Sequence, residues 1–422
     1  MEKQLLEALD TDRLRRDIEE NAEFGRVDTE SGRGRTVLPG TEANRNARER
    51  LVTQLKDANL EVSVDPVGTI VGRYVPSGVD PDTAAVAAGS HLDSVPCGGI
   101  FDGPLGVYGA LEAVRAIDDA NIELHRPIEI VSFTGEEGHR FTDGLLGSSV
   151  ASGDLAIEDA LTFTDDDGIT LRSALEEIGF CGTETIDANA WDAWLELHIE
   201  QGERLTETGV PVGIVDSIAG TTRCTVEIQG EANHSGTTWM DDRTDALVAA
   251  SELVQVVERT ARERAAEDGG RTVATVGELE TEPGAVNVVP GYVRLRIDIR
   301  STEYDTINAI VTTITAELDR LESTRGVETT FDRPYDIEPV PMSRQCIQAL
   351  EAAADWASIE TLAVHSGAGH DTMQIAKSTN AGLLFVPSQD GISHSPEEWT
   401  TWDDCAAGVQ VLTMALIELA QE

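Results

Sequence analysis

The residues best suited to chemistry lie between Gly89 and Gly106, where His91 and Asp93 follow a short apolar run and Asp102 follows a glycine-rich loop. His91 and Asp93 are two residues apart, so in an extended chain their side chains point to the same face. A histidine and two carboxylates at the end of a strand suit zinc, manganese or cobalt. Taken alone, this spacing fits a structural pair as well as a metal site.

Further histidines and carboxylates follow other apolar runs of the chain. Glu136 and Glu137 are adjacent, so their side chains point in different directions, and one can hold a metal while the other acts as a base. A solvated acidic turn also explains this pair, and a satisfied core histidine explains His198. Together with His394, however, these residues can supply a two-metal site in which Asp102 bridges ions about 3.5–4 Å apart.

Alternating strand and helix patterns must position these side chains. Residues 84–88 and 128–134 read as buried strands, and residues 105–117 between them read as a helix. This alternation is typical of an α/β fold with a mainly parallel sheet covered by helices.

The pattern changes near residue 214, where amphipathic strands alternate with long helical stretches at 244–266 and 305–323. Helices of this kind on an antiparallel sheet indicate an α+β layer. We therefore expect a larger α/β domain, formed by residues 1–213 and 330–422, into which an α+β domain of residues 214–329 is inserted.

Composition excludes several classes of partner. The 422 residues carry a formal net charge of −46, which opposes binding to nucleic acid and to anionic membranes. No apolar run is long enough to span a membrane, and the N-terminus has no signal-peptide pattern. The five cysteines are irregularly spaced, which favours a reduced, cytoplasmic protein.

Two explanations of the acidic charge remain open, an acidic binding surface and adaptation to a salt-rich cytoplasm. The charge is spread along the whole chain, and lysine occurs only at Lys3, Lys56 and Lys377. We favour halophilic adaptation, because concentrated salt screens repulsion between like charges.

Passages from about residue 20 to the C-terminus resemble the binuclear metallopeptidase superfamily of carboxypeptidase G2-like enzymes. The resemblance is closest to its hydantoinase/carbamoylase amidases, which include N-carbamoyl-L-amino acid hydrolases, allantoate amidohydrolases and β-ureidopropionases. The passages that carry it are residues 89–96 with 101–103, 136–138, 197–202, 232–238 and 390–396.

The resemblance implies a metal site with two divalent ions per chain, either zinc or manganese, cobalt or nickel. Asp102 would bridge the ions, His91 and His198 would complete one, and Glu137 and His394 the other. Glu136 would be the general base, and Asp93 would orient the His91 ring. Relatives also have a cis peptide bond after the bridging aspartate, here Asp102–Gly103.

Substrate contacts and assembly are implied in the same way. The residues that match the substrate contacts of the family are Gln201, His234, Asn287, Arg300, Gly369 and His370. We expect Arg300, with Asn287 beside it, to bind a substrate carboxylate, and His234 to steady the developing oxyanion. The inserted domain would act as a lid and form a homodimer. His139 and Trp239 depart from the usual residues, so the exact substrate stays open.

The implied activity is hydrolysis of the ureido C–N bond of N-carbamoyl-L-amino acids or of small-molecule ureido acids such as allantoate, a non-peptide C–N bond. A metallopeptidase or an N-acyl amino acid deacylase of the same superfamily is the alternative. His198 and Gln201 argue against it, since peptidase relatives place a carboxylate at the position of His198. A catalytically silent binding protein is the third explanation.

The charge predicts that folding depends on salt. We expect the melting temperature to rise steeply from dilute buffer to molar potassium chloride, because counterions screen the repulsion within a chain of net charge −46. Thermal unfolding followed by circular dichroism tests this, and a melting temperature that is independent of salt would contradict it.

Overall fold

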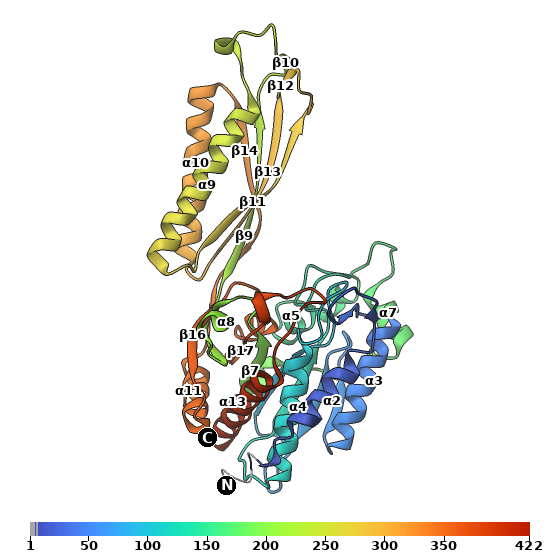
Figure 1. Ribbon diagram of the computed structural model, residues 1–422. Coiled ribbons are helices and arrows are strands. Elements are labelled where there is room, and N and C mark those ends of the chain that lie inside the picture. The colour runs from blue at the N-terminus through green and yellow to red at the C-terminus, as the bar shows by residue number, and fades with distance from the viewer. Residues whose placement is uncertain (1–4, 6) are drawn as a thin grey trace. The chain divides into compact units, whose positions relative to one another are not determined.

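The computed structural model describes residue 5 and residues 7–422, which form two compact units (Figure 1). The first unit contains the described residues up to Asp216 together with 342–364 and 369–422, and the second contains 217–341 and 365–368. Sequence patterns placed these boundaries after residues 213 and 329. The second unit extends beyond residue 329 because β14 (Glu328–Ile337) pairs with β9 (Gly220–Gln229).

The larger sheet has the strand order β15-β8-β17-β7-β5-β6-β4-β3, and β16 also pairs with β8. Its strands are β3 (Glu61–Val64), β4 (Ile70–Tyr74), β5 (Ala85–His91), β6 (Ile128–Phe133), β7 (Trp191–Ile199), β8 (Val212–Ile218), β15 (Val340–Pro341), β16 (Thr361–Ser366) and β17 (Asn380–Val386). Strands β17, β7, β5 and β6 are parallel to one another, whereas β3, β4, β8 and β15 join antiparallel. The predicted α/β fold with a helix-covered, mainly parallel sheet is confirmed, and the parallel pairing lies at its centre.

Helices cover both faces of this sheet. They are α2 (Thr11–Asn21), α3 (Glu42–Asp57), α4 (Pro104–Asp119), α5 (Leu146–Ala151), α6 (Ile157–Ala160), α7 (Leu171–Ile178), α8 (Arg204–Thr208), α11 (Arg344–Ala357), α12 (Asp371–Ile375) and α13 (Trp402–Gln421). Short 3₁₀ turns lie at Ala188–Ala190 and Gln389–Gly391, and the small strands β1 (Arg26–Val27) and β2 (Gly34–Arg35) pair with each other.

The buried strand β5 shows why both faces are covered. Val86 and Ala88 belong to a core that also contains side chains of α4 and α13, whereas Ala85 and Ala87 belong to a core with side chains of α5 and α12. Successive side chains of a strand point to opposite faces, so a strand that is apolar at every position needs cover on both.

Close packing of α4 on the sheet sets the position of the loop before it. Pro104 begins the helix, where its missing N–H costs no hydrogen bond. A Cβ atom at Gly106 would lie 2.5 Å from the carbonyl oxygen of Leu197 in β7 and 2.7 Å from the Cβ of Ser90 in β5. Glycine therefore lets the first turn of α4 touch both strands and holds Asp102 beside their carboxyl ends.

The second unit has an antiparallel sheet in the order β11-β13-β9-β14, with β11 (Val273–Glu282) and β13 (Tyr292–Ser301). The long helices α9 (Ala246–Asp268) and α10 (Tyr304–Arg325) bury the apolar side chains of these strands in a separate core. The short strands β10 (Asn233–His234) and β12 (Val288–Val289) pair with each other, and a 3₁₀ turn lies at Met240–Asp242. This is the α+β layer that the sequence pattern predicted.

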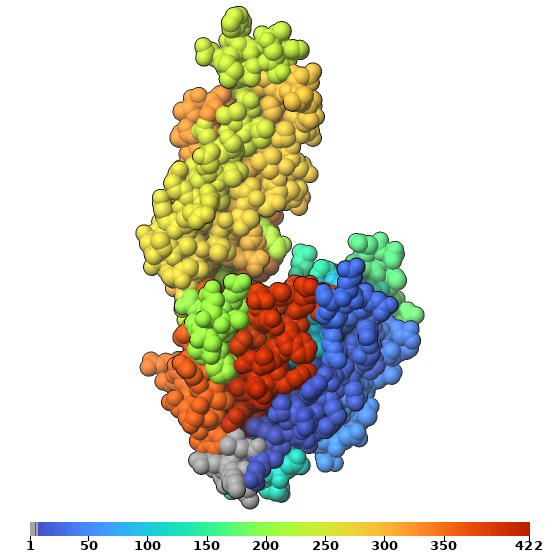
Figure 2. Space-filling view, viewed as in Figure 1, coloured from blue at the N-terminus to red at the C-terminus, as the bar shows by residue number. Residues whose placement is uncertain are grey.

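Segments from both ends of the chain meet on the surface of the first unit. In Figure 2 the blue N-terminal and red C-terminal surfaces adjoin there. The contact includes a hydrogen bond of 2.7 Å from the main-chain N–H of Arg33 to the carbonyl oxygen of Pro396. Residues more than three hundred positions apart in the sequence are therefore in contact on the surface of the first unit.

The expected cis peptide bond at Asp102–Gly103 is not present, and that prediction is wrong. Among the described residues, the cis peptide bond is Glu282–Pro283. Gly103 instead has a φ of 81°, a conformation that favours glycine. Within the part of the chain that the structure describes, no helix is both long and apolar enough to cross a membrane.

Candidate metal centre

The predicted ligands gather where the parallel strands end. His91 is the last residue of β5, His198 is the penultimate residue of β7, and Glu136 and Glu137 follow the end of β6. His394 lies in the loop after β17. Parallel strands present their carboxyl ends at the same edge of a sheet, which is the usual ligand site of an α/β fold.

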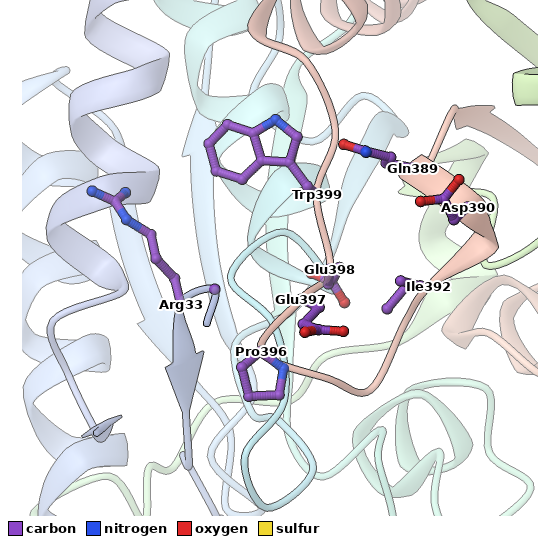
Figure 3. Close-up of a pocket in the computed structure, with 9 residues that line it drawn as sticks. Arg33, Gln389, Asp390, Ile392, Pro396, Glu397, Glu398 and Trp399 are labelled. Carbon is purple, nitrogen blue, oxygen red and sulfur yellow. The ribbon is translucent and has the colours of Figure 1, made fainter. Parts of the chain in front are cut away.

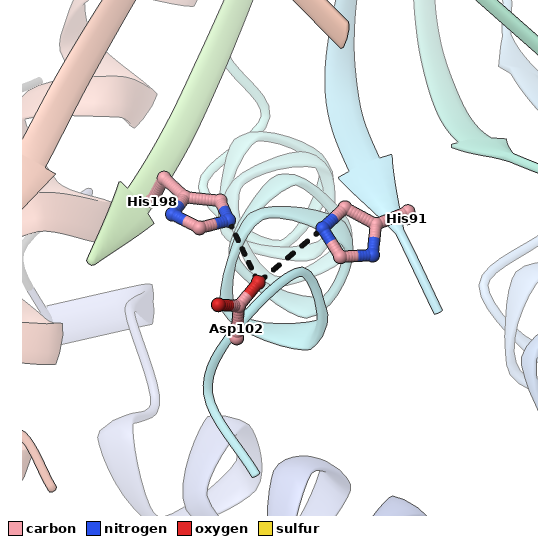
Figure 4. A group of neighbouring side chains, drawn as sticks. All are labelled: His91, Asp102 and His198. Carbon is pink, nitrogen blue, oxygen red and sulfur yellow. Dashed lines mark ion pairs between the residues drawn. The ribbon is translucent and has the colours of Figure 1, made fainter. Parts of the chain in front are cut away.

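His91, Asp102 and His198 form the first group of donors (Figure 4). The Oδ1 atom of Asp102 lies 3.4 Å from Nε2 of His91 and 3.2 Å from Nε2 of His198. All three side chains are buried. Each histidine places its Nδ1 atom near a main-chain carbonyl, at 3.1 Å from Asp93 and 3.0 Å from Ile199. Because a carbonyl only accepts, Nδ1 carries the proton and leaves Nε2 free to bind a metal.

Asp102, Glu137 and His394 form the second group. Nε2 of His394 lies 3.2 Å from Oε2 of Glu137 and 3.6 Å from Oδ2 of Asp102. The two carboxylate oxygens of Asp102 therefore face different groups, as a bridging ligand requires. The His394 side chain is 52% exposed, so the second group is the more open to solvent.

The electrostatics of the cluster favour bound cations. Burial raises the pKa of Glu137 to about 8, and the negative charge of Asp102 adds to this effect. Burial lowers the pKa of His91, but Glu136, Asp102 and Asp93 outweigh it and raise this pKa well above its usual value. Burial also raises the pKa of Asp102, but His198 and His91 hold it well below the usual range. Buried carboxylates with imidazole nitrogens beside them are the donor set of zinc and similar divalent ions, so the residues fit such a group.

Glu136 lies beside the donors but in neither group. Its Oε2 atom is 3.8 Å from Nε2 of His91. Burial raises its pKa well above the usual value; His91 opposes this shift, whereas Glu137 and Asp371 add to it. A carboxylate that is not needed as a ligand can take up a proton, which is the property of a general base.

Asp93 contacts both the His91 ring and the loop of the two glutamates. Its carbonyl oxygen, rather than its carboxylate, makes the 3.1 Å contact with His91, and the carboxylate is 4.0 Å away. The carboxylate accepts hydrogen bonds from the main-chain N–H groups of Gly135, Glu136 and Glu137 at 3.0, 3.4 and 3.2 Å. Asp93 therefore holds the loop of the glutamates as well as the histidine ring.

Two of the predicted substrate-binding residues in the first unit, Gln201 and His370, contact predicted metal ligands. Nε2 of Gln201 donates to Oδ2 of Asp102 at 2.7 Å and to Oγ of Ser393 at 3.1 Å. His370 is buried, and its ring lies edge-on to that of His198 with 4.6 Å between centroids. Burial and the neighbouring His198 lower the pKa of His370 well below its usual value. Gly369 immediately precedes it.

The remaining predicted substrate-binding residues lie in the second unit, where His234 and Asn287 are far from Arg300. His234 lies beside Asn287, because the N–H of Ser235 donates to the carbonyl of Asn287 at 3.0 Å. Arg300 lies near the other end of β13, where it donates to Oδ1 of Asp298 at 2.9 Å and to the carbonyl of Gly367 at 2.8 Å. The expectation that Asn287 lies beside Arg300 within one chain is therefore wrong.

The sequence patterns did not identify several buried polar residues around the cluster. Arg35 and Glu398 are 0% and 2% exposed and hold the loop of Asp102 by hydrogen bonds. Asp371 is also buried, and burial raises its pKa to about 8. Glu398 lies four residues after His394, the one signal that could have drawn attention to it. No local pattern marks Arg35.

A surface pocket of about 460 Å³ lies beside the loop that carries His394 (Figure 3). Its walls come from Gly32, Arg33, Gln389, Asp390, Ile392, Pro396, Glu397, Glu398 and Trp399. None of the five predicted ligands lines it, so this pocket is separate from the donor cluster.

Comparison with known proteins places the chain among amidohydrolases. Residues 87–418 match peptidase family M20/M25/M40. N-carbamoyl-L-amino acid amidohydrolase of Geobacillus stearothermophilus is 39% identical over 94% of this chain and 97% of that protein. Allantoate amidohydrolase of Bacillus subtilis is 36% identical over 92% and 93%. A solved hydantoinase/carbamoylase family amidase of Burkholderia multivorans has a TM-score of 0.92 at 34% identity, covering 98% of each chain.

Replacing Asp102 tests whether the two groups share one bridging ligand. We expect Asp102→Ala to lose bound metal from both groups, because each group loses a carboxylate oxygen. Metal per chain can be measured by mass spectrometry after dialysis in concentrated salt. Asp143→Ala, which removes an exposed carboxylate after Glu137, is the control. Retention of two ions per chain by Asp102→Ala would refute the bridge.

Proposed function

Because the chain belongs to peptidase family M20/M25/M40 and, within it, to the hydantoinase/carbamoylase amidases, we propose that it is a metal-dependent amidohydrolase. The substrates would be N-carbamoyl-L-amino acids or related ureido acids such as allantoate, and the bond cleaved the ureido C–N bond. The observation that carries this proposal is the position of Asp102 between two donor groups, with Glu136 beside them but in neither.

Two divalent ions per chain, zinc or manganese, cobalt or nickel, fit the donors. His91, His198 and Asp102 would hold one, and Glu137, His394 and Asp102 the other. When bound, such ions polarise the scissile carbonyl and stabilise negative charge that develops on it.

The side chains of the protein would move and orient the reacting groups. Glu136 would take the proton of the attacking water and return it to the leaving nitrogen. His234 is suited to donate to the developing oxyanion, because its Nδ1 atom accepts a hydrogen bond of 3.0 Å from the N–H of Gly236. The neutral ring then carries its proton on Nε2, where it can donate. Gln201 and His370 would line the site from the side of the ligands.

A peptidase or an N-acyl amino acid deacylase remains the alternative enzyme. Faster turnover of acetyl-amino acids than of carbamoyl-amino acids would favour this alternative over the amidohydrolase. A chain that binds no metal and releases no product from either class would support a silent binding protein.

The role of Glu136 gives the experiment that tests the activity. We expect Glu136→Gln to lower kcat by about 10²–10⁴-fold, the usual contribution of a general base, with metal content unchanged. Turnover of carbamoyl-amino acids, allantoate and ureidopropionate should be measured with manganese in high salt and with identification of the products. Glu203→Gln changes an exposed carboxylate near Gln201 and should be active. A near-normal kcat for Glu136→Gln would show that the base is another group.

The remote end of the substrate is proposed to bind Arg300. A guanidinium can bind a carboxylate through two parallel hydrogen bonds, a geometry that lysine cannot copy. A fixed cation is needed because a chain of net charge −46 otherwise repels anionic substrates. Arg300 contacts Asp298 and Gly367 through Nε and Nη1, so a substrate would meet its remaining guanidinium donors or displace Asp298.

We expect Arg300→Lys to lose about 1.5–3 kcal/mol of transition-state binding, the range for hydrogen bonds to charged groups. The loss should appear in kcat/KM for carbamoyl-amino acids and be much smaller for their carboxamide analogues. Arg296→Lys, on the same strand and facing solvent, is the matched control. Equal kcat/KM of the parent for acid and carboxamide would remove Arg300 from the site.

We also propose a homodimer in which the second unit acts as lid and interface. His234 and Asn287 lie beyond the Tyr292 end of β13, whereas Arg300 lies near its other end (Figure 1). The eight residue-to-residue steps from Tyr292 to Arg300 span about 27 Å of strand, which is too long for a small ureido acid. If all three residues serve one substrate, they must therefore come from two chains. The exposed side chains of Trp239 and Met240, near His234, would then be covered by the partner.

Complementation tests this shared site. His234→Ala and Glu136→Gln chains should each be inactive, but mixed dimers should recover part of the activity, because one of their two sites contains both intact residues. Dimers should be dissociated and re-formed together, and light scattering should confirm their mass. His139→Ala mixed with Glu136→Gln is the control. No recovery in verified heterodimers would count against a shared site.

We propose that the protein works in a salt-rich cytoplasm, without nucleic-acid or membrane partners. Its five cysteines are free thiols, as is usual in a reducing compartment. The acidic charge supports solubility in concentrated salt.

A further inference from the structure

Arg35 is a buried cation that holds main-chain atoms of the ligand loops. It belongs to β2 and is 0% exposed. Its Nε donates to the carbonyl of Gly99 at 3.1 Å, Nη1 to that of Leu92 at 3.2 Å, and Nη2 to those of Asp93 and Asp102 at 3.4 Å each. One side chain thus connects both ends of the loop between His91 and Asp102.

The carbonyl of Asp93 links Arg35 to the first donor group. The same oxygen lies 3.1 Å from Nδ1 of His91, the nitrogen that sets the orientation of the ring. Arg35 therefore acts on His91 through the carbonyl of Asp93 and on Asp102 through its own carbonyl. Neither contact uses an atom of the two donor groups.

Glu398 binds the main-chain N–H of Asp102, whereas Arg35 binds its carbonyl. It is 2% exposed, and its Oε1 atom accepts hydrogen bonds from the main-chain N–H groups of Phe101 at 2.9 Å and Asp102 at 3.1 Å. Oε2 lies 3.4 Å from the hydroxyl of Ser393, which donates to Oδ2 of Asp102 at 2.8 Å. Glu398 thus holds the backbone of Asp102 and lies beside the hydroxyl that donates to the Asp102 carboxylate.

The surroundings of Glu398 leave it little freedom. A Cβ atom at Gly99 would lie 2.2 Å from the Glu398 carboxylate, so glycine is needed there. The ring of Phe101 packs against Trp399 and Trp402, with centroids 5.4 and 5.2 Å apart. Figure 3 shows Glu398 on the loop that forms the wall of the neighbouring pocket. Close packing at Gly99 and at Phe101 therefore holds the Glu398 carboxylate and the Asp102 loop in contact.

We propose that Arg35 and Glu398 form a clamp that fixes Asp102 as the ligand shared by both metal ions. They are positioning residues, because neither belongs to a donor group and both act through Asp102 and its loop. The inference rests on the proposed function. The clamp explains why a cation from an early hairpin and an anion from the last loop of the chain are buried against the main chain of the same residue, Asp102.

The clamp requires a guanidinium at position 35 and an acceptor oxygen at position 398. The planar guanidinium offers five N–H donors in a fixed arrangement, whereas a lysine ammonium is a compact point charge. Lysine at position 35 would keep the charge but could not hold four carbonyl oxygens spread along the loop. Alanine at position 398 would leave the N–H groups of Phe101 and Asp102 without their acceptor, whereas glutamine would keep an acceptor oxygen.

The test measures metal affinity of the folded protein. The full chain should be prepared metal-free in high salt, and the dissociation constants of Zn²⁺ and Mn²⁺ measured by competition with a chromophoric chelator. We expect Arg35→Lys, Arg35→Met and Glu398→Ala to weaken binding by about 10–100-fold, the range for outer-shell partners of ligands. Glu398→Gln should recover part of the loss. The visible absorption of the Co²⁺-loaded protein should change in the same order.

Matched controls lie within two residues of Arg35 and Glu398 in the sequence. Arg33→Lys and Glu397→Gln alter exposed side chains of the same segments and should bind metal like the parent. Thermal unfolding of each metal-free variant in the same salt separates loss of fold from loss of affinity. If Arg35→Met or Glu398→Ala does not fold, Arg35→Lys decides the outcome, because it keeps the charge but cannot hold the four carbonyl oxygens.

Two results would overturn the clamp. Folded Arg35→Lys and Glu398→Ala that bind both metals within about threefold of the parent, below the range for outer-shell partners, would show that the pair has no influence on the site. Loss of fold in both Arg35→Lys and Glu398→Gln would assign the pair a role in folding only. If the parent itself binds no metal, the proposed function fails together with the clamp, whereas tight binding by parent and variants alike overturns the clamp alone.

Discussion

The carboxylate of Asp102 faces two groups of donors at once, with Oδ1 toward His91 and His198 and Oδ2 toward His394. This requirement organises the first unit. Parallel strands bring the histidines and glutamates to one edge of the sheet, and the close approach of α4 at Gly106 brings the Asp102 loop to the same edge. A shift of that loop by about an ångström would disturb both groups together.

Burial makes the cluster sensitive to charge. Carboxylates taken out of water resist ionisation, as the raised pKa of Glu137, about 8, shows. Divalent ions would relieve this cost directly. Arg35 acts differently, because its hydrogen bonds go to main-chain carbonyls while its charge lies beneath the acidic cluster. Burial lowers its pKa, and Glu398 opposes this shift more than any other carboxylate. Ligand geometry and charge balance thus depend on the same few buried contacts.

The second unit carries proposed substrate contacts instead of metal donors. Its residues bind no metal in our proposal, so they need only present polar groups at the ends of a rigid sheet. His234 and Asn287 lie near one end of β13 and Arg300 near the other, with an apolar core of α9 and α10 beneath the strands. This separation would give the proposed homodimer a chemical purpose, since two chains can bring together groups that one chain holds apart.

Several features of the chain could be predicted because they depend on short stretches of sequence. Apolar runs followed by His91, Glu137 and His198 predicted a sheet edge with donors, and the structure brings these residues together with Asp102 and His394. Resemblance to a family added which donor belongs to which group. The expected cis bond at Asp102–Gly103 was wrong.

The sequence by itself thus determined the α/β architecture, the inserted antiparallel layer and the donors, because periodicity and residue type are local properties. Only the tertiary structure decided that Arg35 and Glu398 hold the main chain of Asp102, that Asp93 binds His91 through its carbonyl, and that Asn287 lies far along the sheet from Arg300. These contacts join residues through main-chain atoms or across long separations. A main-chain carbonyl or N–H is the same at every position, so no residue pattern shows which of them a buried side chain will bind.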